Sequence, residues 1–277
     1  MTLDTGERGA SRPVVALAAV LGVACVVGGA VWLPLAAARQ EELATPVLVE
    51  LFTSEGCSSC PPADALLMRF EAEQPVPGAQ IIGLSEHVDY WDGLGWSDPF
   101  SSTAFTERQE VYRRALGEPV NYTPQIVVDG RTALVGSLEA DARRAIAQAA
   151  ASPKAEIRLQ WVGAMASDVL TIRTRIGSLP ALRDGVIAEL WLAVTETGLA
   201  TNVLRGENAR RRLRHTAVTR RLERVEEFPA LMQRPYEADI AVPLKPNWNR
   251  DQLRVVGFIQ EAASRNVLGV AQISLVP

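Results

Sequence analysis

Two cysteines separated by two serines are the residues of this chain with the clearest chemical potential. Cys57 and Cys60 occur in the stretch GCSSCPP, where a strand-like run meets a helix-like run. The amino end of a helix carries positive partial charge and free N–H groups, which stabilise a thiolate at Cys57. Cys60 follows one turn later and is placed to attack a mixed disulfide on Cys57. This CxxC pair therefore predicts thiol–disulfide exchange, with a permanent structural disulfide as the plainer alternative.

The third cysteine, Cys25, lies in an N-terminal apolar segment. Residues 13–38 contain no charged side chain and follow two arginines, an order typical of an export signal. Ala36 and Ala38 form an A-x-A cleavage pattern, whereas the length of the run also suits a membrane anchor. We expect residues 1–38 to be a signal peptide or an inner-membrane anchor. The rest of the chain is then exported to the periplasm or outside the cell, where a disulfide can persist.

The cysteine pair needs a scaffold, and residues 45–152 alternate strand and helix patterns. Their order is β-α-β-α-β-β-α, with helices expected over residues 62–73, 103–116 and 138–150. Asp129-Gly130 is a typical hairpin turn between the last two strands. This order predicts an α/β domain whose sheet is covered by helices.

Residues 155–277 show a different pattern, with short strands and no convincing helix. Gly, Asn and Pro punctuate the strands, and several strands alternate apolar and polar residues. This pattern predicts an all-β domain, an antiparallel sandwich of the immunoglobulin-like kind. The expected strands are 157–161, 169–176, 187–194, 212–218, 238–242, 253–260 and 267–275.

The first block resembles the thioredoxin superfamily. The resemblance rests on the CxxC pair in a strand-loop-helix and on Tyr122-Thr123-Pro124 before a later strand. It implies that Pro124 is a cis-proline against the cysteines and that Tyr122 and Thr123 contact substrate. Glu50, in the strand before the cysteines, corresponds to the buried acid that assists the resolving cysteine. A solvent-facing Glu50 at a sheet edge is the alternative.

A second resemblance covers nearly all of the chain after the export segment. The stretches LFTSEGCSSCPPADALL, HVDYWDGLGWSDPFSS, YTPQIVVDG, GENARRRLRHTAVTR and VVGFIQEAASRNVLGVAQISL resemble the exported bacterial family called domain of unknown function 1223. That resemblance implies a thioredoxin-like domain in an exported protein. It implies no activity, because the family is named for lacking one.

The loop after the second expected strand suggests further functions. His87 lies near the edge where the cysteine loop is expected, so Cys57, Cys60 and His87 form an alternative metal site for copper or zinc. Trp91 lies in the same loop, where an apolar cluster pinning the loop is the plain interpretation and a peptide-binding rim the alternative.

Charge limits the choice of partner. The chain has 28 Lys+Arg and 32 Asp+Glu, a net charge of -4, which argues against nucleic acid. A local arginine cluster over residues 210–221 is explained by a solvated strand face or, alternatively, by an anionic partner. We therefore expect a protein thiol, disulfide or redox donor as partner, no cofactor beyond the redox-active disulfide, and membrane contact only through the N-terminal segment. The alternative function is a metal- or partner-binding module with a structural disulfide.

Overall fold

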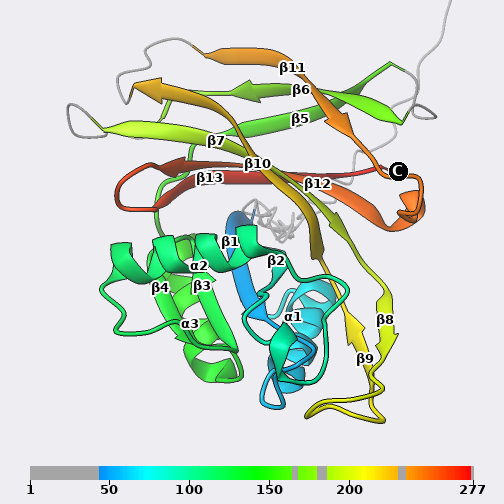
Figure 1. Ribbon diagram of the computed structural model, residues 1–277. Helices are drawn as coiled ribbons and strands as arrows, with labels where there is room; N and C mark the ends of the chain where they lie inside the picture. The colour runs from blue at the N-terminus through cyan, green and yellow to red at the C-terminus, as the bar shows by residue number, and fades with distance from the viewer. Residues whose placement is uncertain (1–43, 164–167, 180–185, 230–234, 276–277) are drawn as a thin grey trace, which may run out of the picture. The chain divides into compact units, whose positions relative to one another are not determined.

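The computed structural model of the chain describes residues 44–163, 168–179, 186–229 and 235–275 (Figure 1). The expected signal or anchor over residues 1–38 lies outside the described residues. Within those ranges, no helix is long and apolar enough to cross a membrane.

The first block contains three α-helices in the described part of the chain, and two of them have a recognisable start or stop. Helix α1 begins at two prolines, which are tolerated in a first helical turn because its N–H groups lack intrahelical partners. Ser102 caps α2 by accepting a hydrogen bond from the Ala104 N–H, and Gly117 ends that helix with φ 71°. The elements are β1 Thr45–Thr53, α1 Pro61–Glu73, β2 Ala79–His87, the short helix η1 Asp92–Leu94, α2 Thr103–Leu116, β3 Gln125–Val128, β4 Thr132–Val135 and α3 Glu139–Ala150.

The second block consists almost entirely of strands in the described residues. Two of them are absent from the expectation above: β8, and most of the long, charge-rich β10. The elements are β5 Ile157–Val162, β6 Val169–Ile176, β7 Ile187–Glu196, β8 Leu199–Asn202, β9 Arg212–His215, β10 Val218–Pro229, β11 Tyr236–Pro243, the short helix η2 Arg250–Gln252, β12 Leu253–Glu261 and β13 Val267–Ser274.

Strand β10 joins the two blocks into one sheet. It pairs antiparallel with β7 along most of its length and pairs parallel with β2 where Val218 faces Ser85. The result is an eight-stranded mixed sheet with the order β13-β12-β7-β10-β2-β1-β3-β4 (Figure 1). A three-stranded sheet, β11-β6-β5, and the β8–β9 pair complete the strands of the described residues.

The predicted fold class, an α/β thioredoxin-like domain followed by an immunoglobulin-like sandwich, is wrong. The helices and strands of residues 45–150 follow the expected order, but their sheet continues through β10 into the second block. All the described residues accordingly belong to one compact unit. The prediction was wrong because the alternation of apolar and polar residues is a local signal. A strand shows the same alternation whether it pairs with a strand of its own block or of the other block.

The core shows how the large sheet curls. Val47, Val49 and Leu51 on one face of β1 pack against α1 and α3. Leu48 on the other face packs with Phe258 of β12 and with residues of β13. Strands β12 and β13, at one end of the large sheet, thus pack against one face of β1, near its other end. The three strands β5, β6 and β11 cover the opposite face of β7 and β12. The two faces of the β1–β2 pair therefore line two separate hydrophobic cores.

Candidate functional site

The predicted cysteine pair forms a disulfide at the junction of β1 and α1. Cys57 and Cys60 are bonded, with their Cα atoms 5.4 Å apart, and Cys60 is the residue that caps α1. Both cysteines are fully buried, whereas Ser58 and Ser59 between them are exposed. Cys57 Sγ lies 3.3 Å from Ser59 Oγ, so this sulfur is in contact with a solvent-exposed side chain.

Of the residues expected to contact substrate, Thr123 lies directly beside Cys57. The Thr123–Pro124 peptide bond is cis, and the Thr123 carbonyl oxygen lies 3.9 Å from Cys57 Sγ. Trp91 donates from Nε1 to Thr123 Oγ1 at 2.9 Å, and the Tyr122 carbonyl accepts from Gln109 at 2.8 Å. The structure therefore brings Trp91, Thr123 and Pro124 together around the disulfide.

Two residues from the second block hold the cysteine loop, and our sequence analysis missed both as site residues. Buried Asn208 donates from Nδ2 to the carbonyl oxygens of Glu55 and Cys57 at 2.8 and 2.9 Å. The neighbouring Glu207 carboxylate accepts the Ser58 N–H at 3.0 Å. Both belong to the GENARRRLRH stretch that carries the family resemblance, but nothing local in that stretch indicates contact with residues about 150 positions earlier.

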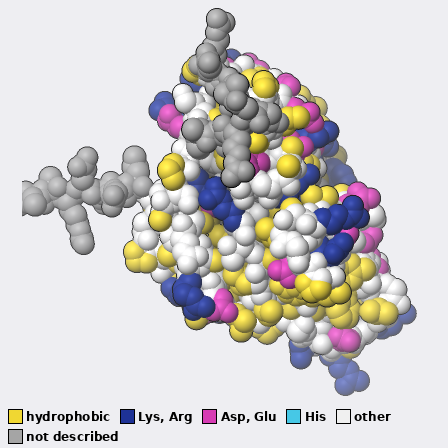
Figure 2. Space-filling view, turned by 90° about the vertical axis from the view of Figure 1, so that its left-hand side faces the viewer, with side chains coloured by type: hydrophobic (Ala, Val, Ile, Leu, Met, Phe, Trp, Pro, Cys, Tyr) yellow, Lys and Arg dark blue, Asp and Glu magenta, His cyan; other side chains and the backbone are white. Residues whose placement is uncertain are grey.

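Beneath the cysteine loop lies a buried cluster of acids and both histidines of the chain. The rings of His87, at the end of β2, and His215, at the end of β9, have centroids 4.9 Å apart. His87 Nδ1 hydrogen-bonds with Asp98 Oδ2 at 2.7 Å, and His215 Nε2 hydrogen-bonds with Glu55 Oε1 at 3.1 Å. Asp98 also accepts the Glu55 N–H at 2.7 Å. No histidine is visible on the face in Figure 2, where acidic and basic side chains are interspersed.

The fifth member of this cluster, Asp64, lies next to Cys60. Its N–H donates to the Cys60 carbonyl at 3.1 Å, and side chains four residues apart on a helix share one face, with Cβ atoms about 5–6 Å apart. Burial raises the pKa of the Asp64 carboxyl, and the opposing effects of His215 and His87 do not cancel that rise. Asp64 therefore keeps its proton to a higher pH than an ordinary aspartate.

Several polar atoms of the cluster are unsatisfied. Asp64 Oδ1, His87 Nε2 and His215 Nδ1 are buried and have no hydrogen-bond partner among the described residues. Unpaired buried polar atoms destabilise a fold by roughly 1–3 kcal/mol each, so their persistence at one place calls for an explanation beyond packing.

His87 and Asp98 form an ion pair. Burial by itself lowers the pKa of His87, but Asp98 and the neighbouring acids raise it by more, and the net pKa shift is upward. Burial raises the pKa of Asp98, but His87 and two backbone N–H groups lower it by more, and the net pKa shift is downward. The imidazolium and carboxylate forms are thus both favoured.

Glu50 is buried, as the predicted role requires, but it faces away from α1. Arg108 donates from Nε to Glu50 Oε1 at 2.6 Å, and the Tyr112 hydroxyl donates to Glu50 Oε2. Gln260 in turn donates to the Tyr112 oxygen at 2.8 Å. No described contact links Glu50 to either cysteine; the buried carboxyl one helical turn from Cys60 is that of Asp64.

The alternative metal site was Cys57, Cys60 and His87. The two cysteines are bonded to each other, and His87 Nδ1 is engaged by Asp98. Within the described ranges, no group of three or more His, Cys, Asp or Glu side chains is arranged to hold a metal ion.

The chain is similar to a protein of known structure. A structural genomics crystal structure of a protein from Agrobacterium tumefaciens is 26% identical, with a TM-score of 0.62, over 83% of this chain and 94% of that one. A calcium-binding mutant of β-glucuronidase 2 from Bacteroides uniformis is 12% identical, with a TM-score of 0.26, over 42% of this chain and 12% of that one. No curated protein matches. The family model described as a protein of unknown function, DUF1223, matches residues 48–260, which include the disulfide, Pro124 and Asn208, and the chain therefore belongs to the DUF1223 family.

Proposed function

We propose that this protein carries out thiol–disulfide exchange with a partner protein through Cys57 and Cys60. The observation that supports it is the disulfide at the start of α1 beside Asp64, a buried carboxyl with an unsatisfied oxygen. A disulfide that only crosslinks the chain needs no proton donor. A disulfide that opens and closes needs one for its leaving thiolate.

The proposed reaction runs in two steps when the partner is oxidised. A partner thiolate attacks Cys57 Sγ, the Cys57–Cys60 bond breaks, and the Cys60 thiolate takes the proton of Asp64. A second partner thiolate then attacks the partner's own sulfur in the mixed disulfide, and Cys57 leaves as a thiolate. The partner loses two electrons to the cysteine pair, and the same steps in reverse reduce a partner disulfide. Access to Cys57 requires the exposed Ser58-Ser59 edge to move aside.

The rest of the proposal concerns location and cofactor. The apolar N-terminal run supports export, with residues 1–38 as signal or anchor. In this proposal the disulfide itself is the redox group, so no metal is required. Edman sequencing or intact mass of the protein from the periplasm distinguishes a cleaved signal from an anchor.

A second candidate is a partner-binding protein with a structural disulfide. The complete burial of both cysteines and the two hydrogen bonds from Asn208 favour it, because they hold the loop closed. The two candidates differ in one measurable property, the reducibility of the folded protein. A structural disulfide resists glutathione until the chain unfolds, whereas an exchanging one equilibrates at native stability.

Trapping tests the exchange directly. Cys60→Ser leaves Cys57 without its resolving partner, so mixed disulfides with Cys57 accumulate and can be identified by mass spectrometry. The matched control, Cys57→Ser, should trap far less, since Cys57 Sγ contacts the exposed Ser59, whereas Cys60 is held at the start of α1. Equal trapping by both variants, or a native disulfide that glutathione reduces only in denaturant, rules out the proposal in favour of the structural disulfide.

Asp64→Asn tests the proton donor. Removal of a general acid or base typically slows a reaction by about a hundredfold or more, so we expect the exchange rate to fall by about that factor near neutral pH. The control, Asp141→Asn on the exposed face of α3, should leave the rate unchanged. If the rate and its pH profile match those of the wild type, Asp64 has no part in the exchange.

A further inference from the structure

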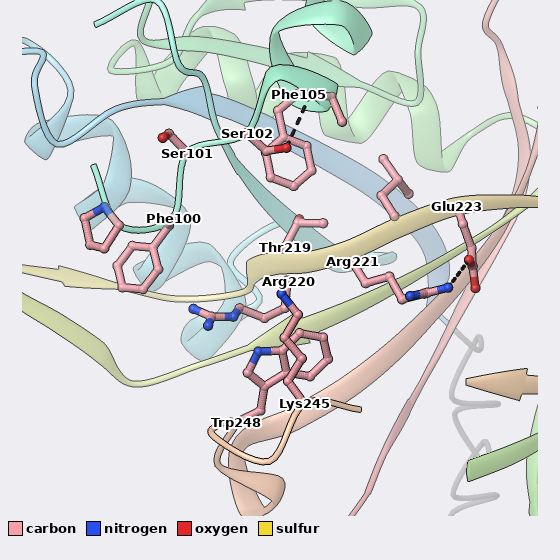
Figure 3. Close-up of a pocket in the computed structure, with 13 residues that line it drawn as sticks. Phe100, Ser101, Ser102, Phe105, Thr219, Arg220, Arg221, Glu223, Lys245 and Trp248 are labelled. Atoms are coloured by element: carbon pink, nitrogen blue, oxygen red, sulfur yellow. Dashed lines mark hydrogen bonds and ion pairs between the residues drawn. The ribbon is translucent and has the colours of Figure 1, made fainter. Parts of the chain in front are cut away.

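A cavity of about 480 Å³ lies between the start of α2, strand β10 and the segment before η2 (Figure 3). This volume is within the range of small-molecule sites in proteins, roughly 300–1,000 Å³. The cysteines do not line it, but Phe100 in its wall has its ring 5.4 Å from His87 and 5.6 Å from His215. The cavity is therefore a separate site that adjoins the buried cluster.

The wall of the cavity is aromatic on two sides. The Arg220 guanidinium lies over the Phe100 ring at 5.3 Å and over the Trp248 ring at 5.7 Å (Figure 3). Phe105 contributes a third ring from the first turn of α2. Flat apolar surfaces with a cation fixed between them suit a planar ligand.

Positive charge dominates the lining. The lining contains three basic residues, Arg220, Arg221 and Lys245, and one acidic residue, Glu223. Arg221 forms an ion pair with Glu223 at 2.5 Å. From beneath, Glu196 approaches Arg220 at 3.5 Å. Lys245 lies 6.0 Å from the Trp248 ring and has no carboxylate partner among the described residues. The exposed Lys245 is therefore a lining cation without a carboxylate partner, in the same cavity wall as the positive end of α2.

Unsatisfied donors also line the cavity. Trp248 Nε1 and Thr219 Oγ1 are buried, with residue exposures of 6% and 2%, and have no hydrogen-bond partner among the described residues. The Nε atom of Arg221 is also buried and has no hydrogen-bond partner among the described residues. An indole N–H, a hydroxyl and a guanidinium N–H are all able to donate to an anion.

We propose that this cavity binds an organic anion with a flat aromatic body. Its acid group is held by Lys245 and Arg220, with Trp248 and Thr219 supplying further hydrogen bonds, and its ring lies against Phe100. The proposal is independent of the disulfide chemistry, since no cysteine takes part.

Calorimetric titration of the full chain with 1-naphthoate tests the proposal, with uncharged 1-naphthalenemethanol as the matched ligand. We expect naphthoate to bind at least about tenfold more tightly than the alcohol, as one charge-assisted hydrogen bond provides. Lys245→Met should weaken naphthoate binding by about tenfold, Lys245→Arg should retain it, and Arg144→Met on α3 should leave it unchanged.

Three results would overturn the proposal. The first is equal affinity for the acid and the alcohol, which would show that only apolar contact is involved. The second is the absence of naphthoate binding at millimolar concentration. The third is wild-type affinity in Lys245→Met, checked as folded by circular dichroism.

Discussion

Two groups of buried charges lie on opposite faces of the β1–β2 pair, and they differ in how their polar atoms are used. On the α2 face, Glu50 is bound by Arg108 and Tyr112, and Gln260 completes the network. On the α1 face, Asp64 and the two histidines each keep an unpartnered buried atom. A buried network in which every polar atom has a partner stabilises the fold. Proton transfer at a disulfide instead needs a nearby titratable group with a free donor or acceptor atom.

Glu86 lies beside the Glu50–Arg108–Tyr112 network but is not hydrogen-bonded to it. Both carboxyl oxygens of Glu86 lack a hydrogen-bond partner among the described residues, and the closest approach of Arg108 Nε is 3.5 Å. Burial and the nearby Glu50 carboxylate raise the pKa of Glu86 well above its ordinary value. The uncharged form of Glu86 is therefore favoured, and Arg108 is paired chiefly with Glu50.

The largest expected effect comes from breaking the Glu50–Arg108–Tyr112 network. Arg108→Met leaves the Glu50 carboxylate buried without its cation, which destabilises a protein by about 3–5 kcal/mol. Denaturant unfolding monitored by circular dichroism measures the loss. Arg113→Met, on the same helix but paired with Glu110 near the surface, should cost less than about 1 kcal/mol. Equal losses would contradict the contrast between a buried and a surface pair.

A smaller effect is expected from Tyr112→Phe. This substitution removes the hydroxyl that joins Glu50 to Gln260 and leaves their polar atoms without a partner, a loss of about 1–3 kcal/mol in unfolding free energy. Tyr90→Phe removes a hydroxyl that bonds to Gln109 at a partly exposed position and should cost about 1 kcal/mol or less. If Tyr112→Phe is neutral, the network contributes nothing as a unit.

The smallest effect has the opposite sign and concerns Asp64. The pKa of its carboxyl is raised in the folded state, so the wild-type protein loses stability as pH rises through the range between the unfolded and folded pKa values. Asp64→Asn lacks that loss and should melt about 2–4 °C higher than the wild type at pH 7, the shift that about 1 kcal/mol produces at this size.

Below the ordinary pKa of aspartate, both residues are neutral and the difference in melting temperature should close. Thermal scans of both proteins from pH 3 to pH 8 measure it. A variant that is less stable than the wild type at pH 7 would show that the Asp64 carboxylate is well solvated or paired, contrary to its burial.

Local pattern predicted much of the chain and of the site. The helices at residues 61–73, 103–116 and 139–150 follow apolar periodicity and start or stop signals that need no tertiary information. The cysteine spacing at a strand-to-helix junction placed Cys57 and Cys60 at the start of α1, where they form the disulfide. Alternation along β1 put Glu50 on the face away from Val49 and Leu51, but it could not say which element covers that face.

Long-range pairing decided the rest. The sequence alone determined where the three α-helices and most of the strands begin, because those signals act over a few residues. Only the tertiary structure set β10, a strand rich in Arg and Glu, between β7 and β2, and so made one sheet of two blocks. The same closure carried Asn208 onto the cysteine loop and His215 against His87. Contacts of this kind depend on which surfaces become buried together, and no local spacing encodes them.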